Sequence, residues 1–85
     1  MYIVYVLVDA IASRTYVGQT QKLSERLTLH NAGRVRSTKG GGPWRVLYQE
    51  QVGSRGDAMK RESYFKSGAG RRQIAKLLQE RCPSG

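Results

Sequence analysis

The sequence predicts one small domain that mixes β-strands with α-helices. Three segments are rich in β-branched and aromatic residues, which favour strands, and three others repeat apolar residues at helical spacing. A chain of 85 residues is long enough for one modest core. Because the sequence contains neither an internal repeat nor a linker, we expect residues 1–85 to form a single domain of the α/β type.

The first two strands are predicted to form a β-hairpin. Residues 2–8 are apolar at every position, which is typical of a strand covered on both faces. A turn over residues 9–13 leads to a shorter strand over residues 15–18. Tyr5 and Tyr16 belong to these two strands, so the hairpin places both phenols in one small region.

Residues 22–32 are predicted to form the first helix, because two leucines four residues apart give it an apolar ridge and Gly33 follows as a stop signal. Arg26 and His30 are also four residues apart, so they lie together on the edge of that ridge. A glycine-rich loop over residues 33–43 follows, and residues 44–51 read as the third strand.

Two further helices are predicted after the third strand. Ser54 is a suitable N-cap for a helix over residues 57–66. Gly68 and Gly70 then interrupt the helical pattern, and the last helix is predicted over residues 71–81.

One carboxylate lies on the apolar face of the second predicted helix. Glu62 follows Ala58 and Met59 and precedes Phe65 at helical spacing, so these side chains are expected to share a face. An unpaired buried carboxylate is costly, and proteins seldom bury one without a partner or a metal. Glu62 is therefore the first candidate for a functional residue.

The charge of the chain favours a phosphate backbone as its partner. The net charge is +9, from 15 basic and 6 acidic side chains. Residues 33–48 contain basic residues and no acidic one, a pattern that favours nucleic acid over a merely solvated surface. Such contacts fix position without reading sequence. The candidate nucleic-acid-binding residues are Arg34, Arg36, Lys39, Arg45, Lys66, Arg71 and Arg72.

The remaining composition indicates a cytoplasmic protein. The single cysteine, Cys82, leaves no intrachain disulfide, and the sequence has no Cys or His cluster for structural zinc. There is no basic leader and no apolar run long enough to span a membrane, so neither a signal peptide nor a membrane partner is expected.

Several polar residues stand in apolar strands or on helix edges in a recognisable order. Together with their neighbours they are Ile3-Val4-Tyr5, Tyr16-Val17-Gly18, Arg26, His30-Asn31 and Arg61-Glu62, with Lys66 one turn later. On these motifs, residues 2–78 resemble the GIY-YIG nuclease superfamily. The resemblance is strongest to its small stand-alone bacterial members, and more distant to the N-terminal nuclease domain of the excision-repair protein UvrC. Ile3 replaces the glycine of the first motif, and valine is the middle residue of both motifs.

The resemblance implies an α+β fold with a three-stranded antiparallel sheet flanked by three helices. It also implies a DNA endonuclease, connected with DNA repair, that uses a divalent metal and acts on branched, nicked or single-stranded DNA. Its implied catalytic residues are Tyr5, Tyr16, Arg26, His30 and Glu62. Glu62 is the implied metal ligand, and a lone carboxylate with waters suits Mg²⁺ or Mn²⁺.

Several alternatives remain open at the level of sequence. Either Tyr5 or Tyr16 would take the proton of the attacking water, and His30 would orient a tyrosine or share the transfer. Glu62 would alternatively be explained by an ion pair with Arg26. A non-catalytic nucleic-acid-binding module would use the same basic surface, and a protein-interaction domain would use it for an acidic partner.

Overall fold

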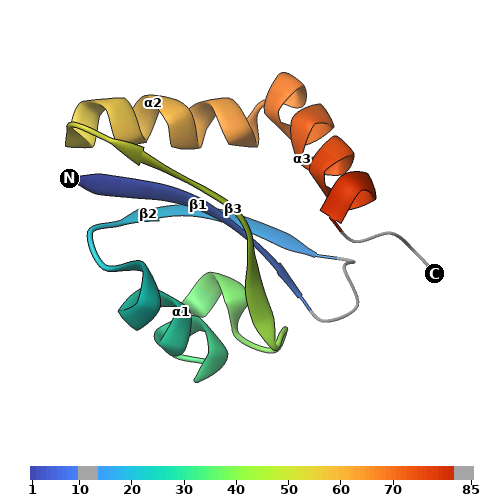
Figure 1. Cartoon of the computed structure of the whole chain (residues 1–85). Helices are drawn as coiled ribbons and strands as arrows, with labels where there is room; N and C mark the ends of the chain where they lie inside the picture. The colour runs from blue at the N-terminus through green and yellow to red at the C-terminus, as the bar shows by residue number, and fades with distance from the viewer. Residues whose placement is uncertain (10–13, 82–85) are drawn as a thin grey trace.

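The computed structural model describes residues 1–9 and 14–81, so most of the predicted turn after the first strand lies outside the described residues. Three strands form one antiparallel sheet in the order β2-β1-β3, and helices flank it, which confirms the predicted fold class (Figure 1). The elements in chain order are β1 Tyr2–Asp9, β2 Thr15–Thr20, α1 Leu23–Asn31, the short 3₁₀ helix η1 Arg36–Thr38, β3 Trp44–Val52, α2 Arg55–Lys66 and α3 Gly68–Arg81.

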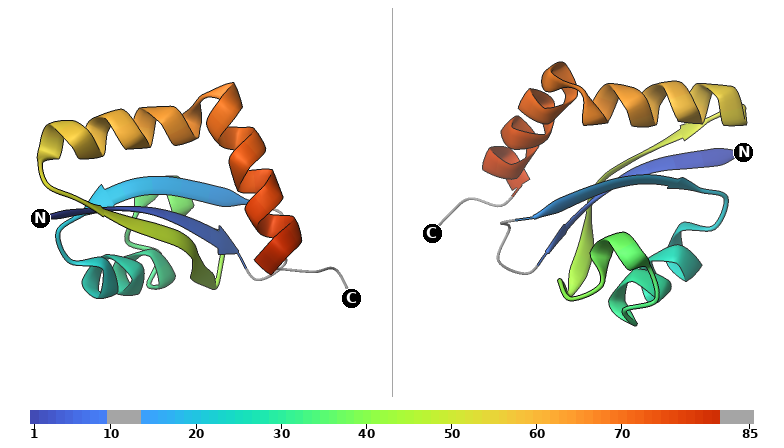
Figure 2. Two further views of the ribbon diagram at one scale, coloured as in Figure 1. Left: turned by 45° about the horizontal axis from the view of Figure 1, so that its top comes forward. Right: turned by 180° about the vertical axis from the view of Figure 1, so that it is seen from behind.

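The sheet is covered on both faces. Helices α2 and α3 lie on one face, and α1 with η1 lies on the other, as all three views show (Figures 1 and 2). The central strand β1 sends Val4 and Val6 into the core under α2 and α3, and Tyr5 and Leu7 into a second core with Trp44. This two-sided burial is the reason that residues 2–8 of β1 are apolar at every position, as the sequence predicted.

The helix boundaries follow local signals, with small corrections. The Ser54 hydroxyl accepts a hydrogen bond from the Asp57 amide at 3.1 Å, which confirms the predicted N-cap of α2. Gly33 has a φ of 73° just after α1, a conformation that favours glycine. The expectation that Met59 shares the buried face of Ala58 is wrong, because Met59 is 54% exposed.

The prediction that Gly68 and Gly70 precede the last helix is also wrong. Helix α3 begins at Gly68 and includes both glycines. A Cβ atom on Gly70 would overlap the Tyr64 carbonyl oxygen and the Phe65 Cα atom. Gly70 therefore lets the first turn of α3 pack directly on the backbone at the end of α2.

We expect Gly70→Ala to lower the free energy of unfolding by about 3 kcal/mol, because the added methyl group meets rigid backbone. In a domain of this size, that corresponds to a fall in melting temperature of roughly 10 °C or more. Gly68→Ala is the matched control, because its Cβ atom meets only Arg72 Nη1 at 3.7 Å. Equal thermal melts for the two variants would contradict this account of the α2–α3 junction.

Candidate active site

The two motif tyrosines meet on the face of the sheet that α1 covers. Their ring centroids are 6.2 Å apart. Gly18 pairs with Tyr5 across the β1–β2 register, and a Cβ atom at Gly18 would lie 2.7 Å from Tyr5 Oη and 2.9 Å from Tyr16 Cε1. The glycine of the second motif is therefore needed for space, because any larger residue would displace the phenols.

His30 connects the tyrosines to η1. Its side chain is only 1% exposed, and its ring centroid lies 4.8 Å from that of Tyr16. The Thr38 hydroxyl donates to the Val35 carbonyl oxygen at 3.4 Å, so it accepts from His30 Nδ1 at 2.8 Å. His30 Nε2 is then the unprotonated nitrogen, and it accepts a hydrogen bond from the Tyr5 hydroxyl, with 3.0 Å between Nε2 and Oη.

Burial and charge hold Tyr5 and His30 in their neutral forms. Burial raises the pKa of Tyr5, and a hydrogen bond from Arg26 opposes that shift. Burial also lowers the pKa of His30, and the positive charge of Arg26 lowers it further. At neutral pH, Tyr5 is therefore a hydrogen-bond donor and His30 an uncharged acceptor.

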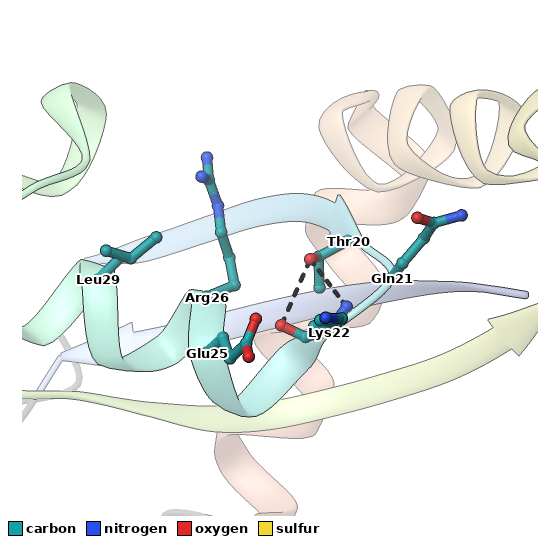
Figure 3. A pocket seen from close by; sticks show the side chains of 6 residues that line it. All are labelled: Thr20, Gln21, Lys22, Glu25, Arg26 and Leu29. Carbon is teal, nitrogen blue, oxygen red and sulfur yellow. Dashed lines mark hydrogen bonds between the residues drawn. The ribbon is translucent and has the colours of Figure 1, made fainter.

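Arg26 lies beside the two phenols. Hydrogen bonding to Tyr5 is the largest influence that raises the Arg26 pKa, and Tyr16 adds to it. Arg26 Nε is buried and has no hydrogen-bond partner among the described residues. Arg26 also lines a cavity of about 300 Å³ at the start of α1, and Figure 3 shows its guanidinium turned away from the Glu25 carboxylate. A half-buried arginine with a buried, unused Nε donor is suited to an anion.

Glu62 on α2 faces strand β2, which also carries Tyr16. Gln19 Nε2 donates to Glu62 Oε1 at 3.1 Å, and Lys66 Nζ lies 2.7 Å from Oε2. The alternative ion pair with Arg26 is therefore wrong. Glu62 is half-buried, with 23% of its side chain exposed, so its partners rather than deep burial explain its position. Its negative charge makes a small contribution to the raised pKa of Tyr5, after burial and the charge of Tyr16.

Arg61, the neighbour of Glu62, fixes the rotation of α2. Its Nε atom donates to Glu50 Oε2 at 2.6 Å, and its guanidinium carbon lies 5.0 Å from the Phe65 ring centroid. Arg61 is the main cause of the lowered pKa of Glu50. This contact ties α2 to β3, while Glu62 faces β2 one position further along the helix.

The structure distributes the predicted nucleic-acid-binding residues over several elements. Lys66, Arg71 and Arg72 belong to α2 and α3, Arg34, Arg36 and Lys39 belong to the segment between α1 and β3, and Arg45 belongs to β3 itself (Figure 1). That segment is only partly a loop, since it contains η1 and buries Val35 and Thr38. The prediction of a uniform basic loop is therefore corrected, because part of it completes the core and the histidine site.

Two residues that contact the candidate site were missed in the sequence. Thr38 fixes the tautomer of His30, and Gln19 holds the Glu62 carboxylate. Asn31 ties α1 to the start of β3, because its side chain accepts a hydrogen bond from the Trp44 amide at 2.6 Å and donates one to the Trp44 carbonyl oxygen at 3.1 Å. Of these three residues, only Asn31 was noted in the sequence, because it directly follows His30.

The described residues contain no group of three or more His, Cys, Asp or Glu side chains suited to hold a metal. Glu62 is the carboxylate of the candidate site that could hold a divalent ion, with water or substrate oxygens as the other ligands. Within the same part of the chain, none of the helices is both long and apolar enough to cross a membrane.

Comparisons with known proteins agree with the fold and the motifs. The family model described as the GIY-YIG catalytic domain matches residues 1–74. A UPF0213 protein of Staphylococcus haemolyticus is 37% identical over 67 residues, which are 78% of this chain and 80% of the relative. A UPF0213 protein of Oceanobacillus iheyensis is 36% identical over 52 residues, 60% of each chain.

A solved structure is similar as well. The solution NMR structure of a UPF0213 protein from Bacillus halodurans matches with a TM-score of 0.52 and 30% identity, over 91% of this chain and 85% of that one. The GIY-YIG domain is a nuclease domain, so the family implies a nucleic acid as substrate. The match to the catalytic domain over most of its length, together with these small bacterial relatives, shows that the chain belongs to the GIY-YIG family.

Proposed function

We propose that the protein is a divalent-metal-dependent endonuclease that hydrolyses phosphodiester bonds in DNA, with a preference for branched, nicked or single-stranded forms. The observation that carries this proposal is the hydrogen-bonded series Tyr5–His30–Thr38 beside Arg26. Its polar groups are buried in an 85-residue domain, where unused polar groups are costly. A role in chemistry accounts for this arrangement better than a role in packing.

The proton of the attacking water passes through Tyr5 in this mechanism. The water O–H bond breaks as its proton moves to Tyr5 Oη, and the original Tyr5 proton moves to His30 Nε2. The water oxygen attacks phosphorus as the bond from phosphorus to the leaving oxygen breaks, and the leaving oxygen takes a proton from solvent. Tyr5 needs no prior ionisation, which is consistent with its raised pKa. We call this path from water through Tyr5 to His30 the relay. In this mechanism Tyr16 packs beside the relay and is not the base.

Arg26 stabilises the phosphate in this mechanism. Its unpartnered Nε and its position beside the phenols suit it to the non-bridging oxygens, on which negative charge increases in the transition state. The same positive charge disfavours protonated His30 before substrate binds. A bound phosphate offsets that effect, so His30 becomes a better proton acceptor when the substrate is in place.

Glu62 is the proposed metal ligand. Each of its oxygens accepts one hydrogen bond in the structure and so retains a further lone pair, and a carboxylate is the donor that Mg²⁺ and Mn²⁺ prefer. A divalent ion held there would neutralise charge on the phosphate and polarise its P–O bonds. Lys66 pairs with one oxygen of Glu62, and its positive charge would be repelled by the ion, so this side chain would swing away when the ion binds.

The test is cleavage of labelled linear, nicked, flapped and branched DNA by the purified protein, with Mg²⁺, Mn²⁺ or EDTA. We expect cuts that depend on metal and are abolished by EDTA, with one branched, nicked or single-stranded form cut faster than intact duplex. Salt-sensitive binding without cuts on any DNA would instead favour the non-catalytic binding module, in which Lys66 permanently occupies Glu62.

A further inference from the structure

A second cavity adjoins the candidate active site at the free edge of the sheet. It has a volume of about 320 Å³, and its lining residues are Thr15, Tyr16, Val17, Phe65, Lys66, Arg71 and Ile74. Strand β2 is an edge strand, since the order is β2-β1-β3. The cavity therefore lies between this edge and the junction of α2 with α3. Figure 2 shows that this junction lies on one side of the sheet.

Residues that line this cavity contact the parts of the candidate site on both faces of the sheet. Tyr16 packs with the second core, on the α1 face, whereas Val17 packs with the first core, under α2 and α3. Lys66, which also lines the cavity, is paired with the Glu62 carboxylate. A strand of nucleic acid bound at the tyrosines would therefore reach this cavity by passing around the edge of β2.

The lining combines an apolar floor with a cationic rim. Val17, Phe65 and Ile74 are buried and form the apolar part, while Lys66 and Arg71 carry positive charge. No acidic side chain lines it in the described part of the chain. Apolar surface for a base or sugar and cations for a phosphate are the combination that binds single-stranded nucleic acid.

We propose that this cavity binds one unpaired nucleotide of the DNA strand, next to the phosphate that is cleaved. Its volume is near the lower end of ligand pockets, which span roughly 300–1,000 Å³, so it fits one nucleotide rather than a base pair. Arg71 and Lys66 hold the phosphate of that nucleotide, and Val17 and Ile74 contact its apolar surface. The inference rests on the proposed function and narrows its substrate to DNA with unpaired nucleotides at the cut.

Arg71 and Arg72 provide a matched pair of variants. Both are exposed arginines in the first turns of α3, but only Arg71 lines the cavity. Binding of labelled single-stranded and duplex oligonucleotides is measured by fluorescence anisotropy in EDTA, where no cleavage occurs. We expect Arg71→Ala to weaken single-strand binding about tenfold, the loss of one charge-assisted contact, and Arg72→Ala to weaken it by no more than about threefold. Duplex binding should respond equally to the two variants.

The binding assay separates this inference from the nuclease proposal. If the wild-type protein cuts no DNA with Mg²⁺, the nuclease proposal fails, yet a selective effect of Arg71→Ala on single-strand binding still supports the nucleotide site. Equal weakening of both DNA forms by the two variants would overturn the site. Thermal melts of both variants, expected to match the wild type because the arginines are exposed, exclude a general loss of folding.

Discussion

Glu62→Gln is expected to reduce metal-dependent DNA cleavage by roughly a thousandfold. The variant keeps the size of the side chain but removes a carboxylate whose charge contributes to the raised pKa of Tyr5. Stabilisation by a bound divalent ion is worth several kcal/mol, and about 4 kcal/mol corresponds to a thousandfold in rate. The measurement is the single-turnover cleavage rate with Mg²⁺, together with calorimetric titration of Mn²⁺, for which Glu62→Gln should bind more weakly.

Glu80→Gln is the control for the change in charge. Glu80 is exposed on α3 and does not line either described cavity, so its replacement should leave the cleavage rate within about twofold of wild type. Glu62→Gln should still fold, because its partly exposed pair with Lys66 contributes at most about 0.5 kcal/mol. Cleavage by Glu62→Gln near the wild-type rate would exclude Glu62 as the metal ligand and return it to a structural role.

Most of the fold could be predicted because its signals are local. The unbroken apolar run of residues 2–8 indicated a strand buried on both faces, and Ser54 marked the start of α2. The start of α3 could not be predicted in this way. Gly70 reads as a helix breaker, but its role is a tertiary contact with the backbone of Tyr64 and Phe65, which no local propensity contains.

The candidate site could likewise be predicted only where its signals are local in the sequence. The order of its polar residues in the sequence was informative, because strand alternation and helical spacing give those residues defined faces. Thr38 and Gln19 gave no comparable signal, since the first bonds a residue 8 positions away and the second a residue 43 positions away. The proposal of Tyr5 rather than Tyr16 as the base also depended on the structure, because the bond between Tyr5 and His30 joins residues 25 positions apart.

His30→Gln is expected to reduce the cleavage rate by about a hundredfold. Glutamine can accept the Tyr5 hydrogen bond and donate to Thr38, but it cannot take the proton that the proposed relay delivers, and general-base catalysis contributes roughly 10²–10⁴-fold. Glutamine therefore tests the chemistry with less disturbance of packing than alanine. A rate within a few-fold of wild type would remove His30 from the relay and leave it as a core residue.

The pH dependence gives an independent test of His30. The relay requires neutral His30, so activity should be lost as pH falls through its pKa, which burial holds below the ordinary value of 6.5 even where a bound phosphate offsets the charge of Arg26. Wild-type cleavage should accordingly persist at pH 6.5 and decline only at lower pH, and the residual activity of His30→Gln should lack that decline. The native state also prefers neutral His30, so its contribution to stability is present above pH 6.5 and lost as pH falls through the native pKa.

Variants of Thr38 test whether the tautomer of His30 affects the cleavage rate, because they leave the histidine ring itself in place. Thr38→Val removes the acceptor for His30 Nδ1, which allows the proton to move to Nε2 and turns the base of the relay into a donor. We expect a loss of about tenfold in cleavage rate, since this substitution acts on the orientation of His30 and leaves its ring in place. Thr38→Ser restores the hydroxyl and should recover most of the rate, whereas equal rates for the valine and serine variants would show that the hydroxyl does not direct the histidine.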